Sequence, residues 1–276
     1  MSRYAIAIDV NKCVGCYNCF LTCRDEFAGN NYPGYSAPQP MSGGNWITIK
    51  EIERGSFPHV KVNYVPLTCS HCDSANCVKL DQTGAVYRRP DGIVMIDPEK
   101  AKGNKAIVNT CPYRRIEWNE ELQLPQKCTM CAHLLDKGER EPRCVETCPS
   151  GALVFGDLDD PESEISKLYA SGNYAPLNPD YDMGEKVLYK DVPKKFVAGT
   201  VIYSDIDEVA SGAKVTLTGP DGEMTTVANG FGDFEFEGLP DNVTYTVQIE
   251  APGYQKVTLT AKTSKDVYLG EIMLFK

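Results

Sequence analysis

Alternation of apolar and polar residues predicts short strands scattered through the first 170 residues. The runs at 4–9, 93–96 and 152–155 alternate, and each lies beside a turn, as strands do. The segment ESEISKLYA places apolar side chains at helical spacing, so we expect a helix at 163–170. These short elements predict an α+β domain over residues 1–170.

From residue 196 to 276 the chain alternates almost throughout. Turn residues such as Pro220-Asp221-Gly222 and Pro252-Gly253 separate the alternating runs. Regular short strands of this kind predict a β-sandwich or a barrel over 196–276. The seven runs are VAGTVIY, AKVTLTG, EMTTVA, DFEFEG, TYTVQIE, QKVTLTA and YLGEIML.

Two segments show little periodicity. Residues 28–66 interrupt the first domain as an insertion loop that begins with GNNYPGYSAPQPMSGGNW. A plain surface loop and a docking segment for a partner subunit are both open interpretations, because long loops inside compact domains often carry function. Residues 171–195 contain Gly, Asn and Pro, and we expect a linker or a strap across a neighbouring surface.

Composition limits the partners and the location. The chain has 276 residues and a net charge of −10, which argues against binding to nucleic acid or to an anionic membrane surface. No apolar run approaches the roughly 20 residues that a membrane helix needs. The N-terminal segment MSRYAIAIDV shows neither a secretory signal nor a twin-arginine pair. We therefore expect a cytoplasmic protein without direct membrane insertion, unless a partner subunit carries an export signal.

Twelve cysteines are the main chemical feature of the chain, and all of them lie between Cys13 and Cys148. A reducing compartment disfavours disulfides, so metal binding is the expected use of these thiols. The motifs are Cys13-x2-Cys16-x2-Cys19-x3-Cys23, Cys69-x2-Cys72-x4-Cys77, Cys111-Pro112 and Cys128-x2-Cys131-x12-Cys144-x3-Cys148-Pro149.

The first motif has the spacing of bacterial ferredoxins. In that arrangement three close thiolates hold one [4Fe–4S] cluster and the fourth cysteine reaches a different cluster. Soft thiolate sulfur suits iron. Three zinc sites of four cysteines would also use all twelve thiols, but zinc sites usually pair two separated C-x2-C knuckles. The spacing therefore favours iron–sulfur clusters over zinc.

The crossover rule assigns the ligands of three [4Fe–4S] clusters with no cysteine left over. The fourth cysteine of each outer motif serves the other outer motif, and the middle motif takes the one cysteine that remains. The predicted sets are Cys13, Cys16, Cys19 and Cys148; Cys23, Cys128, Cys131 and Cys144; and Cys69, Cys72, Cys77 and Cys111.

A fourth cluster is missing where the ferredoxin template predicts one. If Cys111 is the last cysteine of a C-x2-C-x2-C-x3-C motif, the first three cysteines of that motif are replaced by other residues. The cysteine expected four residues after Cys77 is replaced as well. Gly103 stands where Gly15 stands in the first motif. Loss of a cluster and coincidence are both open, and we favour loss because the glycine and the Cys-Pro pair are retained. The four positions are Asp81, Ala101, Asn104 and Ile107.

The cysteine-rich part of the chain resembles a known family. The segments IDVNKCVGCYNCFLTCRDE, CSHCDSANC, KCTMCAHLLDKGEREPRCVETCPSGAL and FGDLDDPES are similar to iron–sulfur subunits of the dimethyl sulfoxide reductase family of molybdenum and tungsten enzymes. This resemblance implies two ferredoxin-like modules, which commonly hold four clusters, and a large molybdopterin catalytic subunit as partner in a heterodimer or a larger assembly. The chain departs from the family pattern at the four substituted ligand positions.

The last domain resembles transthyretin-like, carboxypeptidase regulatory-type domains through GTV, SGAKVTL, PDG, GDFEFEGLP and YTVQIEAPGY. No Ser/His/Asp or Cys/His set is visible there, so we expect a docking or stabilising role. The expected fold class is therefore α+β, with two ferredoxin-like [4Fe–4S] modules followed by an all-β, Greek-key domain of transthyretin type.

The histidines are His59, His71 and His133, and the last two lie beside cluster cysteines in SHC and CAH. Their expected role is to donate a hydrogen bond to a cluster or simply to cover it, because neither is needed to complete a ligand set.

The expected function is electron transfer, with no catalytic residue on this chain. Three clusters, a missing fourth, no membrane anchor and the transthyretin-like domain together resemble small subunits of transhydroxylases, which move a hydroxyl group between polyhydroxylated benzenes. That resemblance implies molybdenum bis-pterin guanine dinucleotide on the partner subunit only. Two alternatives stay open: an electron relay of a molybdenum or tungsten reductase or dehydrogenase, and a structural scaffold with non-redox clusters.

Overall fold

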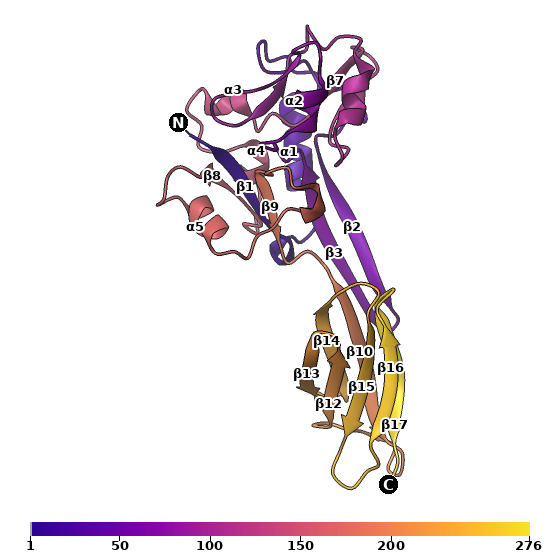
Figure 1. The fold of residues 1–276 in the computed structure, drawn as a ribbon. Coiled ribbons are helices and arrows are strands. Elements are labelled where there is room, and N and C mark those ends of the chain that lie inside the picture. Colours follow the sequence, from indigo (N-terminus) through magenta and orange to yellow (C-terminus); the bar gives the residue numbers. More distant parts are fainter. Residues whose placement is uncertain (1) are drawn as a thin grey trace. The chain divides into compact units, whose positions relative to one another are not determined.

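The computed structural model describes residues 2–276, which form two compact units (Figure 1). The first unit contains the chain up to Glu51 together with Asn63–Val192, and the second contains Ile52–Val62 and Pro193–Lys276. Each unit has buried apolar clusters of its own. None of the helices within residues 2–276 combines the length and the apolar character that crossing a bilayer requires.

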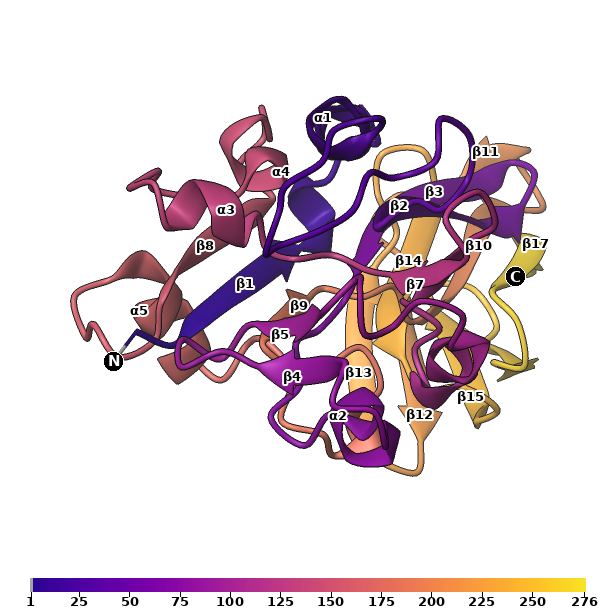
Figure 2. The ribbon, with the colours of Figure 1, turned by 90° about the horizontal axis from the view of Figure 1, so that it is seen from above.

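A buried strand near the N-terminus organises the first unit. β1 (Tyr4–Asp9) pairs antiparallel with β8 (Leu153–Asp157) and parallel with β9 (Val187–Lys190), so segments far apart in the sequence lie side by side. α5 (Glu164–Ala170) packs against β1 and β8 (Figure 2), and its Ile165 is fully buried. β1, β8 and α5 confirm the strands and the helix that the sequence predicts at 4–9, 152–155 and 163–170.

Short helices and hairpins carry the cysteine motifs. Elements of three to ten residues have little stability alone, so packing around the cysteines holds them in place. The predicted strand at 93–96 is present as β5. The elements are α1 (Asn18–Phe27), α2 (Asn76–Leu80), α3 (Ala132–Leu135), α4 (Arg143–Glu146), the hairpins β4 (Val86–Arg88) with β5 (Val94–Ile96) and β6 (Glu117–Asn119) with β7 (Leu124–Gln126), and 3-10 helices at Val10–Lys12, Lys105–Thr110 and Pro179–Tyr181.

The segment 28–66 is not the loop that its composition predicts. Its second half forms the hairpin of β2 (Ile47–Ser56) and β3 (His59–Thr68). The runs ITIKEIER and HVKVNYV alternate apolar, mostly β-branched residues with polar ones, and that alternation favours strands despite the Gly- and Pro-rich start of the segment. The loop prediction was wrong for this half, and the tip of the hairpin belongs to the second unit.

Residues 171–195 are more ordered than the predicted linker. β9 lies in this segment, and its Val187 and Tyr189 are buried. Ala175 and Tyr189 also exchange backbone hydrogen bonds of 2.9 and 2.8 Å. A four-residue strand is too short for alternation to reveal it. Its pairing partner β1 also lies at the other end of the unit's sequence, so no local pattern indicates the pairing.

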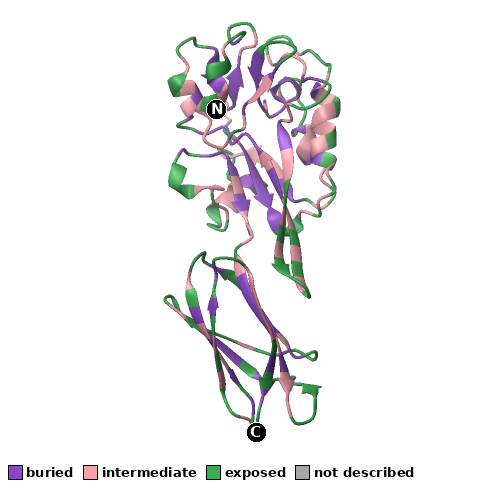
Figure 3. Ribbon diagram, turned by 90° about the vertical axis from the view of Figure 1, so that its right-hand side faces the viewer, coloured by how far each residue is buried: buried purple, intermediate pink, exposed green. Residues whose placement is uncertain are grey.

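The second unit consists of two β-sheets with a common apolar core. In one sheet β10 pairs antiparallel with β11 and β14 and parallel with β17; the other has the antiparallel order β13-β12-β15-β16. Figure 3 shows both buried and exposed residues along the strands of this unit. The seven predicted runs are all strands, and the short β11 was not predicted. The strands are β10 (Lys195–Tyr203), β11 (Glu208–Val209), β12 (Lys214–Gly219), β13 (Gly222–Val227), β14 (Asp233–Leu239), β15 (Thr244–Glu250), β16 (Val257–Lys262) and β17 (Val267–Leu274).

Candidate metal centres

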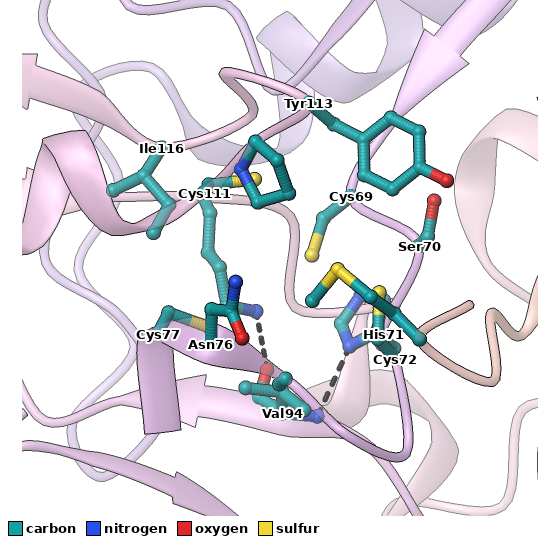
Figure 4. Close-up of a pocket in the computed structure, with 14 residues that line it drawn as sticks. Cys69, Ser70, His71, Cys72, Asn76, Cys77, Val94, Cys111, Tyr113 and Ile116 are labelled. Carbon is teal, nitrogen blue, oxygen red and sulfur yellow. Dashed lines mark hydrogen bonds between the residues drawn. The ribbon is translucent and has the colours of Figure 1, made fainter. Parts of the chain in front are cut away.

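Four cysteines from two separate stretches of the chain line one pocket in the first unit. Figure 4 shows their side chains around a common space. Apolar side chains, among them Ile116 and Met183, complete the wall. The cysteines are Cys69, Cys72, Cys77 and Cys111.

A second pocket is lined by a second group of four cysteines. The wall also includes the buried Phe27 and Trp46, whose ring centroids lie 4.5 Å apart. One of the four comes from α1, far in the sequence from the other three. The cysteines are Cys23, Cys128, Cys131 and Cys144.

The remaining four cysteines form a third group near the surface. The nearby thiols of Cys13, Cys148 and Cys16 contribute to raising the pKa of Cys19, after the larger effect of burial. Cys148 reaches this group because α1 packs against α4, with Thr22 Oγ1 and Thr147 Oγ1 3.2 Å apart. The structure therefore places Cys148 beside the first motif and Cys23 beside the third, and the three spatial groups coincide with the three predicted sets.

Burial shapes the electrostatics of these thiols. It raises the pKa of Cys19 and Cys131 to about 12 and that of Cys77 to about 11, because a thiolate is costly away from water. Grouped thiolates add repulsion to this cost, so only a strongly positive group can draw all four protons off. Iron supplies that charge and prefers sulfur ligands, so the donor sets fit iron–sulfur clusters.

The cysteine loops share a backbone feature. The second residue after the first cysteine of each motif has a positive φ: +66° at Gly15, +45° at His71 and +50° at Met130. Such a conformation turns the chain sharply and directs amide groups toward the enclosed sulfur, as when Met130 N–H donates to Cys128 Sγ at 3.3 Å. Gly103, two residues after Ala101, has a φ of +78°. The loop without cysteines therefore keeps the turn of a cluster-binding loop.

The Cys-Pro pairs also form equivalent turns. Arg114 N–H donates to the carbonyl oxygen of Cys111 at 3.0 Å, and Gly151 N–H donates to that of Cys148 at 3.3 Å. Each donor residue has a positive φ, +52° and +63° respectively. Cys111 and Cys148 therefore stand in the same local geometry, as expected of corresponding positions in two related halves.

Packed protein surrounds the four positions where the ferredoxin template predicts cysteines that this chain lacks. Ala101 and Ile107 are fully buried in an apolar cluster that includes Val94. The carboxylate of Asp81 accepts hydrogen bonds from Val86 N–H at 2.8 Å and from the Thr83 hydroxyl at 2.7 Å, which fixes the turn after α2. Asn104 N–H closes a turn onto the carbonyl oxygen of Ala101 at 3.0 Å. The substituted positions thus serve packing and loop structure.

His71 and Lys127 lie at the wall of the Cys69 pocket. His71 is almost fully buried, and its Nδ1 accepts a hydrogen bond from Val94 N–H at 3.1 Å. Burial, together with the positive charges of Lys127 and Arg88, lowers the pKa of His71 well below its usual range. The sequence suggested His71 through its place between two cysteines. It gave no comparable signal for Lys127, which simply precedes Cys128.

A charged network supports the Cys23 pocket. Glu26 accepts hydrogen bonds from Tyr32 Oη at 2.6 Å, from His133 Nε2 at 2.9 Å and from Arg143 Nε at 3.0 Å. Burial alone would raise the pKa of Glu26, but these three donors outweigh it and lower the pKa to about 2. The network joins α1 to α3 and α4, which carry Cys23, Cys131 and Cys144 on or beside them. Sequence reasoning missed Glu26 and Arg143, since only the fold brings them together.

Comparison with protein families matches two parts of the chain. Residues 60–158 match a family described as a 4Fe-4S dicluster domain, which covers every cysteine after Cys23. Residues 197–269 match the carboxypeptidase regulatory-like domain, in agreement with the resemblance seen in the strands of the second unit.

Full-length relatives extend the match to the whole chain. The pyrogallol hydroxytransferase small subunit of Pelobacter acidigallici is 41% identical over 99% of this chain and 100% of its own length. The arsenate respiratory reductase iron–sulfur subunit of Shewanella sp. (strain ANA-3) is 31% identical over 68% of this chain and 95% of its own length. A tetrathionate reductase subunit of Salmonella typhimurium is 33% identical over 71% of this chain and 75% of its own length.

Proposed function

This chain belongs to the family of iron–sulfur subunits of dimethyl sulfoxide reductase-type enzymes, and we propose that it relays electrons for a molybdopterin-containing partner subunit. The observation that carries the proposal is the gathering of twelve cysteines into three spatial groups of four. Groups of four thiols are the ligand sets of [4Fe–4S] clusters, which accept and donate single electrons.

Each group holds one cluster in this proposal. The shared turn after the first cysteine of each motif and the matching Cys-Pro turns support one design used three times. Crossed pairing between the outer motifs supports two ferredoxin-like modules, one of which has lost a cluster. The ligand sets are Cys13, Cys16, Cys19 and Cys148; Cys23, Cys128, Cys131 and Cys144; and Cys69, Cys72, Cys77 and Cys111.

The neighbour relations between groups support a linear order. Cys19 of the first group interacts electrostatically with Cys23 and Cys144 of the second. Cys128 of the second group interacts in the same way with Cys69 of the third. The second cluster therefore lies between the other two, and electrons pass through it.

The first group is the end of this line that reaches the surface. Cys16 is exposed, and Val14 and Leu21 beside it are 64% and 53% exposed. Electron transfer weakens steeply with distance, so a cluster near the surface is suited to exchange electrons with another subunit. We assign this face to contact with the catalytic subunit, which would carry molybdenum bis-pterin guanine dinucleotide.

The reaction proposed for the assembled enzyme is conversion of pyrogallol to phloroglucinol, in which a second polyhydroxylated benzene donates the new hydroxyl group and pyrogallol loses one of its own. Identity of 41% along the whole chain to a pyrogallol hydroxytransferase small subunit supports it. Hydroxyl transfer between polyhydroxylated benzenes brings no net redox change, so the enzyme needs no outlet for electrons. A relay shortened by one cluster is consistent with such a reaction. The second unit would then serve docking or stability.

Metal analysis of the native complex tests the proposal. The complex should be purified without oxygen from its source and assayed for iron, sulfide, zinc and molybdenum. We expect about twelve irons per copy of this chain, after subtraction of iron on the partner, and a molybdenum-containing large subunit. About sixteen irons, or zinc in place of iron, would contradict the three-cluster assignment.

Substrate assays separate the proposal from its alternative. Relatives named as arsenate and tetrathionate reductase subunits make a reductase the second candidate. Conversion of pyrogallol to phloroglucinol in the presence of a second polyhydroxylated benzene as hydroxyl donor, without an added electron acceptor, supports the transhydroxylase. Activity seen only as oxidation or reduction of an external dye would support a reductase or dehydrogenase instead.

A further inference from the structure

Lys127 carries a buried charge that the surrounding protein does not neutralise. Only 3% of the residue is exposed, and Nζ donates to the carbonyl oxygens of Val94 and Cys128, the latter at 3.0 Å. Among residues 2–276, no carboxylate oxygen lies within 4.0 Å of this Nζ. A buried ammonium group without a counter-ion is costly, so the site requires an anion that these residues do not supply.

The side chain lies where two of the proposed clusters are neighbours. Lys127 lines the pocket of the Cys69 group, while its own backbone leads directly into Cys128 of the second group. Its charge lowers the pKa of Cys77, Cys111 and Cys128 against the larger effect of burial. A [4Fe–4S] cluster with four thiolates is anionic, and it therefore provides the missing counter-charge.

His71 contributes a second donor in the same pocket. Because Nδ1 accepts the Val94 N–H, the proton of the neutral ring is on Nε2. Within the described chain this buried Nε2 has no hydrogen-bond partner. The residue has a φ of +45°, the turn that it shares with Gly15 and Met130 in the other cysteine loops. The unpaired buried donor indicates an acceptor in the pocket.

Val94 holds both donors in place. Its N–H donates to His71, as a dashed line in Figure 4 shows. Its carbonyl oxygen accepts a hydrogen bond from Lys127. Val94 is itself buried in β5, so neither donor can turn away without loss of a buried hydrogen bond. The Lys127 ammonium group and the His71 Nε2–H group are therefore both held in fixed positions by hydrogen bonds to one strand.

We propose that Lys127 and His71 raise the reduction potential of the cluster held by Cys69, Cys72, Cys77 and Cys111. Reduction by one electron adds negative charge to the cluster, and a fixed cation and a fixed N–H donor stabilise the reduced form more than the oxidised one. Both are positioning residues and neither is a ligand. The inference rests on the proposed three-cluster function.

Other charges near this pocket remain unchanged when Lys127 is replaced. Glu185 is buried and accepts a hydrogen bond from the Tyr113 hydroxyl, and it acts electrostatically on Cys72. Arg88 donates to the carbonyl oxygens of Cys72 and Asp73, the second at 2.7 Å. A substitution confined to Lys127 therefore leaves these charges in place, while it removes the ammonium group and its hydrogen bonds to Val94 and Cys128.

The test is an anaerobic redox titration of the whole complex, followed by electron paramagnetic resonance. Lys127→Met removes the charge and keeps the apolar stem, Lys127→Arg keeps the charge, and Lys100→Met is a matched control on an exposed lysine. We expect Lys127→Met to lower the reduction equilibrium constant of one cluster by at least about tenfold, which is about 59 mV for one electron. His71→Leu should lower the same potential, and Lys127→Arg and Lys100→Met should leave it near the wild-type value.

The signal is assigned with Cys111→Ser, which should lack the cluster affected by Lys127→Met. Iron analysis of the wild type comes first, because about twelve irons establish the proposed function independently of any potential. Unchanged midpoints in a Lys127→Met complex with all its iron would overturn the inference. If Lys127→Met loses the cluster, Lys127→Gln is used as the neutral variant instead. Loss of the cluster in both neutral variants but not in Lys127→Arg supports a role for the positive charge of Lys127. Loss of the cluster in Lys127→Arg as well refutes that role.

Discussion

Gly15 and Gly103 adopt the same left-handed turn, with φ of +66° and +78°, in two loops that differ in their chemistry. Gly15 follows Cys13 by two residues, and Gly103 follows Ala101 by two. A Cβ atom built on Gly15 would lie 2.6 Å from the Tyr64 ring, whereas one on Gly103 would have no atom within 4 Å. At Gly15 both the positive φ and the close Tyr64 ring favour glycine, whereas at Gly103 only the positive φ does.

This contrast predicts unequal effects of the same substitution. Gly103→Ala should cost about 1 kcal/mol, the usual penalty of a left-handed conformation for a residue with a Cβ atom. Gly15→Ala should cost more and should release iron from the Cys13 group, because the Tyr64 ring must move to admit the methyl group. Denaturant titration under anaerobic conditions, with iron analysis of each purified variant, measures both effects. Equal losses of stability, with full iron content in both variants, would contradict this account.

The spatial grouping of the twelve cysteines could be predicted from the sequence because cysteine spacing is a local pattern. The exchange of Cys23 and Cys148 between the outer motifs follows from the crossover rule of ferredoxins, and Cys111 is the one cysteine left for the middle motif. The strands after residue 196 could be predicted for a similar reason: each carries its own alternation and is bounded by turn residues. Cysteine spacing and strand alternation could be read from the sequence because each depends on residues close together in the chain.

Contacts between distant segments could not be predicted in this way. β9 exists because β1 offers it a partner edge, and nothing within its four residues shows this. The hairpin of β2 and β3 was hidden by the Gly- and Pro-rich start of its segment. The donors on Glu26 come from three parts of the chain, and Lys127 becomes notable only once its buried position is known.

Ile107 should behave as an ordinary core residue, although it stands where a fourth cluster would have a ligand. It is 2% exposed and packs with other apolar residues of the middle part of the chain. Ile107→Ala should cost about 2–4 kcal/mol, through lost transfer free energy and a residual cavity. Leu80→Ala is the control, since Leu80 is 61% exposed and should change stability by less than about 0.5 kcal/mol. Iron content should stay near the wild-type value in both variants; a stability of Ile107→Ala equal to that of the control would show that the region is not packed as described.

Lys61 ties the tip of the β2–β3 hairpin to β14 within the second unit. Its Nζ pairs with the carboxylates of Glu235 and Glu237 on β14 and lies 5.3 Å from the centroid of the Phe196 ring. Lys61→Met should cost no more than about 1 kcal/mol, because partly exposed ion pairs contribute little. Local opening of the tip should nevertheless become more frequent.

Limited proteolysis reports on that opening. Cleavage within residues 52–62 should be faster in Lys61→Met than in the wild type, while Lys50→Met, a change at an exposed position of the same hairpin, should leave the rate unchanged. Equal cleavage rates in all three proteins would mean that the apolar contacts of the tip hold it without the ion pairs.

Glu26 predicts how the stability around the Cys23 pocket depends on pH. Its pKa is about 2 in the folded chain, below the usual value of 4.5, because the hydrogen bonds from Tyr32, His133 and Arg143 outweigh the effect of burial. A carboxyl group with a lowered pKa stabilises the folded state above about pH 4.5, and that contribution is lost as the pH falls toward 2. The side chain is 14% exposed, and the shift corresponds to a stabilisation on the order of 2–3 kcal/mol at neutral pH.

Glu26→Gln should therefore unfold at a lower denaturant concentration than the wild type at pH 7, as measured by circular dichroism under anaerobic conditions. Glu162→Gln, a change at an 86% exposed side chain, should unfold at the wild-type concentration. The difference between Glu26→Gln and the wild type should stay constant from pH 8 to about 5 and narrow below pH 4.5, because protonation then removes the charge from the wild type as well; a difference that persists undiminished at pH 3 would show that shape and hydrogen-bond geometry, rather than charge, account for the contribution of Glu26.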